Sequence, residues 1–281
     1  MKKILLLMVA TAAITVSSCK KPGPDPVPPT PEPDKIPIRL STDISVKASD
    51  SGYENGDMIG IYTVNHTDGT PGSLADSGNH LDNTRFTFDG TEWKADSEVY
   101  WADQTTPADF YCYYPYTESV ADVTALTFSV QEDQSTLDNY KASELLYGKT
   151  EGAQPSADPV KITTRHALSN VIIYVVPGKG YTEETLAAEE IAVTVTGVKT
   201  TAKLNLATGK TSADGELKDI IGKEIIKVTV GTDVYTLNQT VTFEQNKQHT
   251  CTLTINRIGE GVNISIGGWE SADTDFGGTL D

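Results

Sequence analysis

The chain has 281 residues, and its 39 acidic and 22 basic side chains give a formal net charge of −17. Such an acidic chain repels nucleic acid and anionic lipid surfaces, so the composition excludes a nucleic-acid-binding function. The charge fits a body that stays soluble outside the cell, and the roughly 245 residues after the N-terminal segments are enough for two domains of about 120 residues.

The N-terminal residues have the pattern of an export signal. Lys2 and Lys3 precede an apolar run at residues 4–16, which is too short to span a bilayer, and small residues then lead to Cys19. This order is typical of a bacterial lipoprotein, in which the cysteine thiol receives a diacylglycerol. An ordinary signal peptide followed by an incidental cysteine is the alternative. We expect a signal peptide at residues 1–18 and lipid attachment at Cys19.

A proline-rich linker follows at residues 19–37. Its eight prolines lie between Pro22 and Pro37 and prevent the segment from packing a core. Such a segment favours the polyproline form, which rises about 3.1 Å per residue and gives a stalk of roughly 50 Å. A lipid on Cys19 and this stalk would hold the rest of the chain at a distance from a membrane.

Period-two alternation predicts strands through the first half of the body, residues 38–158. Asp89 and Gly90 predict a tight two-residue hairpin turn. Residues 135–146 have mixed apolar spacing and predict a short helix or turn. The polar segment 150–159, with two prolines and a glycine, predicts a domain boundary. The expected strands are 38–46, 58–64, 85–88, 91–94, 109–114 and 125–130.

The second half, residues 159–281, repeats this style without a sequence repeat. Residues 169–176 are almost all apolar, which predicts a strand covered on both faces. Thr182 predicts the N-cap of a helical turn at residues 182–190. Many short strands separated by turns predict antiparallel β-sandwiches. The other expected strands are 191–195, 202–206, 225–230, 234–237, 241–243, 250–255 and 262–266.

The chain shows no pattern of catalytic or metal-binding residues. No histidine has a second ligand at metal spacing, so we expect solvated side chains at His66 and His80 and a hydrogen-bonded structural residue at His166. The acidic residues 273 and 275 predict a solvated tail rather than a calcium site. The sequence therefore predicts no enzyme, no cofactor and no metal.

Cys112 and Cys251 lie on the apolar phase of alternating runs, which predicts two small core residues. A disulfide between them is the alternative in an oxidising compartment. Phe110, Cys112 and Tyr114 should share one face of their strand and the neighbouring tyrosines the other. The aromatic residues around this strand predict a core, and a sugar-binding surface is the alternative.

Several segments, in order, resemble fimbrillin-like lipoproteins (the fimbrillin A-associated or minor fimbrillin-like group) of Bacteroides-type bacteria. The resemblance begins with the glycine-aspartate, isoleucine-glycine strand at residues 56–62 and covers residues 38–281. Thr164 is a departure, because the family usually has a large apolar residue before the histidine. The signature residues are Gly56, Asp57, Gly60, Trp93, Trp101, Tyr114, Pro115, His166 and Trp269.

The resemblance implies two tandem transthyretin-like antiparallel β-sandwiches, 38–158 and 159–281. It implies a pilus subunit, or a pilus anchor or accessory adhesin, in the outer membrane or the fimbrium. The partners would be membrane lipid at Cys19, other fimbrial subunits, and host or bacterial surface ligands.

In polymerising relatives an arginine-specific protease frees an N-terminal strand, and a neighbour's strand then fills the groove. The resemblance transfers this cut to Arg39, for which an outward-facing strand residue is the alternative. A cut after Lys47, which would remove the whole first strand, is a second possibility that the sequence leaves open.

A glycan-binding outer-membrane lipoprotein of an uptake system is the alternative function. An exposed row of tryptophan and tyrosine side chains would favour it, whereas burial of Trp93, Trp101 and Tyr113 would favour the fimbrial function. An enzyme would instead require a cleft with converging ionisable groups.

Overall fold

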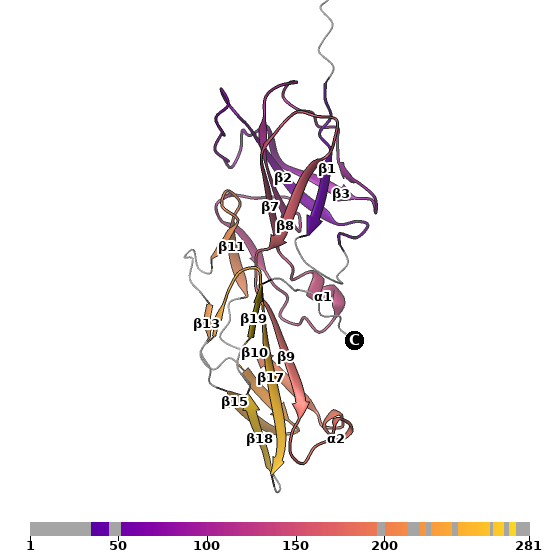
Figure 1. The fold of residues 1–281 in the computed structure, drawn as a ribbon, viewed down its shortest axis with the longest axis vertical. Coiled ribbons are helices and arrows are strands. Elements are labelled where there is room, and N and C mark those ends of the chain that lie inside the picture. Colours follow the sequence, from indigo (N-terminus) through magenta and orange to yellow (C-terminus); the bar gives the residue numbers. More distant parts are fainter. Residues whose placement is uncertain are drawn as a thin grey trace, which may run out of the picture. The chain divides into compact units, whose positions relative to one another are not determined.

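The structure is a computed structural model, and it describes residues 35–44, 52–195, 200–212, 220–222, 226–237, 241–258, 261–266 and 270–273. Apart from two short helices, all regular secondary structure of the described chain is strand, which confirms the all-β prediction (Figure 1). The elements are β1 Leu40–Ile44, β2 Met58–Asn65, β3 Leu81–Phe88, β4 Trp93–Ala95, β5 Ala108–Tyr114, β6 Leu126–Ser129, α1 Leu137–Lys141, β7 Leu146–Ala153, β8 Val160–His166, β9 Asn170–Pro177, α2 Glu183–Ala187, β10 Ile191–Val195, β11 Thr201–Asn205, β12 Lys210–Ser212, β13 Ile220–Gly222, β14 Ile226–Val230, β15 Asp233–Leu237, β16 Val241–Phe243, β17 Lys247–Ile258, β18 Gly261–Ile266 and β19 Glu270–Asp273.

The largest sheet has seven strands in the order β1-β8-β7-β5-β2-β3-β4. Its pairs are antiparallel except β1 with β8, which run parallel from Leu40 opposite Val160 to Ile44 opposite Thr164. This parallel pair departs from the predicted antiparallel pattern. It joins two segments about 120 residues apart, and the sheet therefore depends on both ends of a long stretch of chain.

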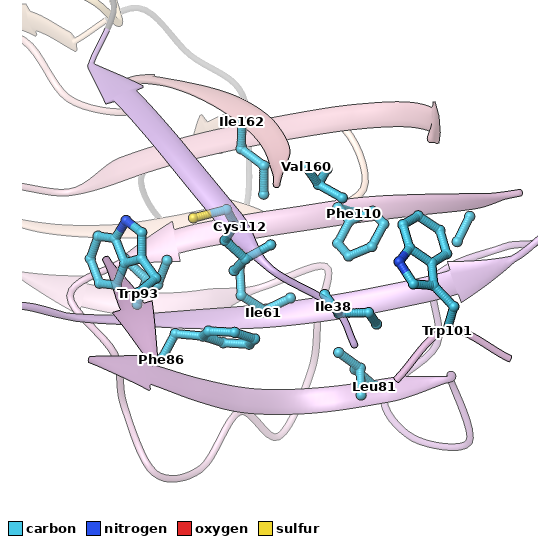
Figure 2. Packing of buried hydrophobic residues seen from close by; sticks show 13 residues of the cluster. Ile38, Ile61, Leu81, Phe86, Trp93, Trp101, Phe110, Cys112, Val160 and Ile162 are labelled. Carbon is cyan, nitrogen blue, oxygen red and sulfur yellow. The ribbon is translucent and has the colours of Figure 1, made fainter. Parts of the chain in front are cut away.

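The seven-stranded sheet has a hydrophobic cluster on each face. Strand β5 shows this directly, since Phe110 and Cys112 enter one cluster while Tyr111 and Tyr113 enter the other. Figure 2 shows the first cluster, where Phe110 and Cys112 lie among side chains from several strands. The prediction that alternate residues of this strand enter opposite faces is confirmed.

The cluster on the second face also uses residues from later in the chain. Strand β11 pairs with β6, and Leu204 and Leu206 pack against Tyr62 and the tyrosines of β5. Strand β8 likewise belongs to the seven-stranded sheet. The predicted boundary at residues 158 and 159 therefore divides segments that pair with each other. The two-domain division and the transthyretin-like arrangement stay predictions.

A third hydrophobic cluster lies among the C-terminal strands. Cys251, Leu253 and Ile255 of β17 are buried there with residues of β14, β16 and α2. The sheets in this part have the orders β10-β14-β15 and β18-β17-β19, and β9 pairs with β17. The β9–β17 pair is parallel, which is the second departure from the antiparallel pattern.

Most predicted strands are present, with ends shifted by a few residues, and both short helices form. Thr182 caps α2, as predicted, by accepting a hydrogen bond from the Thr185 amide. Strands β7, β8, β12, β13 and β19 had no counterpart among the strands expected from alternation.

Two local predictions are wrong. The β3–β4 hairpin has a four-residue loop at residues 89–92, because the Asp89 carboxylate accepts the amides of Thr91 and Glu92, each at 2.9 Å. Strand β9 is not covered on both faces. It is half-buried along its length and Tyr174 is 54% exposed, because Val171, Ile173 and Val175 pack on the core and the residues between them lie on the outer face.

Candidate functional site

Residues 36–44, near the start of the described chain, are held on both edges. The Ile38 amide donates to the Val99 carbonyl at 2.9 Å, and the Trp101 amide donates to the Ile36 carbonyl at 2.9 Å. From Leu40 onward the segment pairs with β8. Ile38 and Leu40 are buried in the cluster of Figure 2, whereas Arg39 between them is exposed. The segment thus fills a strand position whose inward side chains complete the core.

A side-chain hydrogen bond joins the two outer strands of the seven-stranded sheet. Trp93 of β4 donates through Nε1 to the Thr42 hydroxyl of β1 at 2.8 Å. The neighbouring Asp43 carbonyl accepts from the Thr164 hydroxyl at 3.3 Å. Strand β1 is therefore fixed by side chains as well as by its main-chain pairing.

An aromatic cluster lies beside this bond. Tyr53 packs edge-on against Trp93, with 4.9 Å between ring centroids, and against Tyr114 at 5.8 Å. The Tyr53 and Thr164 hydroxyls are 2.9 Å apart and share a hydrogen bond. Burial raises the pKa of Tyr53 well above its ordinary value. A threonine at residue 164 thus provides a polar partner for Tyr53.

Gly56 and Asp57 form the turn that leads into β2. Gly56 has a φ of 99°, which favours glycine, and its amide donates to the Phe88 carbonyl at 2.8 Å. The Asp57 carboxylate accepts the Glu54 amide at 2.7 Å and the Tyr114 hydroxyl at 3.3 Å. These two signature residues therefore fix where β2 begins.

Gly60 is required by the packing of Tyr113. The two residues are paired across β2 and β5, and a Cβ at Gly60 would lie 2.2 Å from Cε1 of Tyr113. The Tyr113 hydroxyl donates to the Asn83 side chain at 2.6 Å, which holds the ring over the glycine. The glycine is therefore needed because it leaves room for the tyrosine ring.

The remaining expected site residues are distributed over the chain. Trp101 contacts Phe110 edge-on at 5.3 Å, and half-buried Pro115 follows β5. His166 ends β8 beside Glu144, with Nδ1 at 3.2 Å from the carboxylate, and burial lowers the pKa of His166 to about 4. The predicted lipid site at Cys19, Trp269 and the residues from 274 onward lie outside the described residues.

The other histidines are structural residues, and the prediction that His66 and His80 are solvated is wrong. His66 bonds through Nε2 to the buried Asp109 carboxylate at 2.8 Å, and the same oxygen accepts the Gly152 amide at 2.8 Å. Nε2 of His80 is 2.7 Å from the Tyr100 carbonyl. Buried His249 accepts the Glu244 amide at 3.0 Å, and burial lowers its pKa.

These side chains do not converge on a reaction centre. No group of three metal-binding side chains is close together within the part of the chain that the structure describes. A pocket beside Val64, Asn65 and His80 has His80 as its ionisable group. Cys112 and Cys251 are buried free thiols in different clusters, and burial raises the pKa of both, which confirms two small core residues.

The burial of the aromatic residues distinguishes the two functions expected from the sequence. Trp93 is 7% exposed, Trp101 is 5% exposed and Tyr113 is fully buried. These side chains build cores and offer no stacking surface for a sugar. The described helices are all too short or too polar to cross a membrane.

Comparison with known proteins identifies the family. The model of the fimbrillin-like family matches residues 46–269. The chain belongs to the fimbrillin-like family. A protein of Bacteroides uniformis, named as a candidate fimbrium subunit, Fim1C, is 29% identical over 232 residues, which are 79% of this chain and 71% of that protein.

Two solved structures share the fold of this fimbrillin-like chain. A candidate cell adhesion protein from Bacteroides uniformis superposes with a TM-score of 0.61 at 20% identity, over 84% of this chain and 97% of that one. Another, from Bacteroides ovatus, gives a TM-score of 0.63 at 14% identity, over 84% and 98% of the two chains. The family model confirms the resemblance, and these two structures confirm the fold.

Proposed function

We propose that this fimbrillin-like chain is a non-enzymatic subunit or anchor of a surface fimbria, assembled by strand exchange. A lipid on Cys19 and the stalk at residues 19–37 would tether it to the outer membrane. Its family and the name of its Bacteroides uniformis relative support this role. The observation that carries the proposal is that residues 36–44 occupy a strand position at the edge of β8. This position, with the core sites of Ile38 and Leu40, is called the seat below.

The seat has the features that strand exchange requires. Main-chain bonds from Val99 and Val160 recognise any extended segment, since they involve no side chain of the occupant. Ile38 and Leu40 enter the core at every second position, as a donor strand's side chains would. If residues 36–44 leave, these sites and the edge of β8 become available to an extended strand from another subunit.

The position of the cut determines how much of the seat is emptied. The Arg39 side chain is exposed, but its carbonyl accepts the Val160 amide at 2.8 Å and its neighbours are buried. Cleavage at Arg39 therefore requires residues 36–40 to leave the sheet edge first. It would detach the lipid, the stalk and the bonds of residues 36–39, and Leu40–Ile44, then held by β8 alone, would have to leave before another strand could pair there. A cut after Lys47 would release all of β1 directly.

Arginine-specific proteolysis of the folded mature chain, followed by N-terminal sequencing and sizing, tests this proposal. We expect a cut after Arg39, a new N-terminus at Leu40, and a ladder of oligomers. The Arg39→Gln variant should lose both the cut and the ladder. Arg165→Gln, which changes another exposed arginine in the same sheet, should keep both. A fully cut chain that stays monomeric would overturn assembly by strand exchange.

The tether is tested separately through Cys19. The wild-type chain should partition with membranes and carry an added lipid mass, and Cys19→Ser should release it into the soluble periplasmic fraction. If Cys19→Ser stays with the membrane and the wild-type chain carries no lipid, the anchoring proposal fails.

A further inference from the structure

Three buried polar atoms at one end of the seven-stranded sheet have no hydrogen-bond partner among the described residues. They are Oγ1 of Thr63, Oδ1 of Asn65 and Nε1 of Trp101. Thr63 is fully buried, and Trp101 is 5% exposed. An unpaired polar atom in a core costs free energy, so three of them in one region require a physical explanation.

The pairing of β2 with β5 places the three side chains on one face of the sheet. Thr63 lies opposite Phe110 and Asn65 opposite Ala108, and both partners belong to the cluster of Figure 2. Trp101 belongs to the same cluster, and its ring contacts the Phe110 ring at 5.3 Å. Figure 2 shows the indole nitrogen on the side of the ring that faces Phe110. The three polar side chains therefore gather around Phe110 and Ala108.

The chemistry of the three atoms defines what can bind between them. The indole N–H of Trp101 only donates, so the occupant must accept a hydrogen bond, which a metal ion cannot do. The amide oxygen of Asn65 only accepts, so the occupant must also donate, which excludes a simple anion. The Thr63 hydroxyl can take either role. A neutral molecule with both roles is required, and water is the one small enough for a packed core.

We propose that one water molecule binds at this site. It accepts from Nε1 of Trp101 and donates to Oγ1 of Thr63 and Oδ1 of Asn65, and about three hydrogen bonds are usual for an internal water. Asn65 also lines the pocket beside His80, which gives water a route to the site. The water joins strand β2 to the loop at residues 96–107, which carries Trp101.

This water has a consequence for the N-terminal segment. The loop that carries Trp101 also holds residues 36–38, through main-chain bonds at Val99 and Trp101. Nε2 of His80 fixes the loop through the Tyr100 carbonyl at 2.7 Å, and the water adds a second attachment at the Trp101 side chain. Loss of the water should therefore loosen the loop and the N-terminal segment together, whether or not this segment is exchanged during assembly.

Thr63→Val tests the site, because valine keeps the shape of threonine and removes the hydroxyl. With the water bound, the variant loses a hydrogen bond, and the equilibrium constant for unfolding in urea should rise about fivefold. In a dry core, the variant would remove an unpaired polar atom and make the chain more stable. Thr163→Val, at an exposed position of β8, should change the constant by no more than about twofold. A neutral or stabilising effect of Thr63→Val would overturn the proposal.

A crystal structure of the mature chain with Cys19→Ser, which carries no lipid, shows the occupant directly. We expect density for one water within hydrogen-bond distance of Nε1 of Trp101 and Oγ1 of Thr63. A dry site, or a direct protein acceptor for Nε1, would overturn the proposal even if Thr63→Val lowers stability.

Amide exchange followed by NMR tests the effect on the N-terminal segment. In Thr63→Val, exchange should speed up at the amides of Ile38 and Trp101 by at least about threefold more than at Gly56. The Gly56 amide bonds Phe88 at the opposite end of β2 and serves as the matched control. Equal changes at all three amides would show that the water does not hold the loop.

Discussion

The seven-stranded sheet and the sheet of β9, β17 and β18 differ in how many of their faces are covered. Strand β5 in the first is buried at six consecutive positions from Ala108 to Tyr113. Strand β17 in the second alternates, with Cys251, Leu253 and Ile255 buried and the threonines between them half-buried. The first sheet is therefore determined by side-chain shape on both sides. In the second, the side that carries Tyr174, Thr252 and Thr254, called the open face here, is only half-buried or exposed.

Two glycines sharpen this comparison and give the largest expected effect. A Cβ on Gly60 would lie 2.2 Å from the buried Tyr113 ring, and a Cβ on Gly178 would lie 2.2 Å from the Asn256 side chain on the open face. The ring cannot move, so Gly60→Ala should lower the free energy of unfolding by about 3 kcal/mol. Asn256 is half-buried, and turning it away loses the hydrogen bond that its Oδ1 accepts from the Lys179 amide at 2.9 Å, so Gly178→Ala should cost about 1 kcal/mol.

Urea denaturation of both variants measures these costs. Equal costs would mean that the two faces respond alike to added volume, which would contradict the comparison.

The link between β4 and β1 gives the next effect. Trp93→Phe removes the donor to Thr42 and some buried volume, and should cost about 2 kcal/mol. Thr42→Val leaves Nε1 without its acceptor and should cost about 1 kcal/mol. In the double variant the hydrogen bond is lost only once, so the double variant should lose less stability than the two single variants lose together. Full additivity in thermal or urea unfolding would show that the bond contributes nothing.

The two buried histidines predict how stability depends on pH. The pKa of His166 is about 4 in the folded chain and about 6.5 when unfolded, so its stabilisation is present above pH 6.5 and is lost as the pH falls toward 4. Between pH 7 and 5 the loss should be about 1–2 kcal/mol. The lowered pKa of His249 acts in the same direction.

Unfolding titrations at several pH values check this dependence. His166→Gln should flatten it, and a profile unchanged by that substitution would contradict the role of His166.

The smallest effect is expected on the open face. Tyr174→Ser should change the unfolding free energy by less than about 0.5 kcal/mol, because the side chain is half exposed. Tyr113→Ser in the covered sheet should cost several-fold more. A large loss of stability from Tyr174→Ser in dilute protein would show that the open face is structural.

The sequence predicted local patterns well and long-range neighbours poorly. Alternation assigned Phe110 and Tyr111 to opposite faces, because the period of a strand fixes which way each side chain points. The apolar run of β9 suggested burial on both faces, yet only one face packs on the core, and which segments cover a face is decided elsewhere in the chain. Strand β8 was missed because Thr164 and His166 are inward-facing polar residues, which disguise the alternation.

The site residues show the same limit. Gly60 was singled out by resemblance, but its reason, the Tyr113 ring, lies on another strand. His66 was expected in solvent because its loop is polar, whereas its partner Asp109 is 43 residues away. Hydrogen bonds that join distant segments leave no local signal in the sequence.

The parallel pairing of β1 with β8 has a consequence for the order of folding. Leu40 cannot meet Val160 until about 120 further residues have been made, and closing so long a loop is slow. The first strand to emerge is therefore the last to join its sheet. The strand that joins this sheet last is also the one whose departure disturbs the fewest earlier contacts within it.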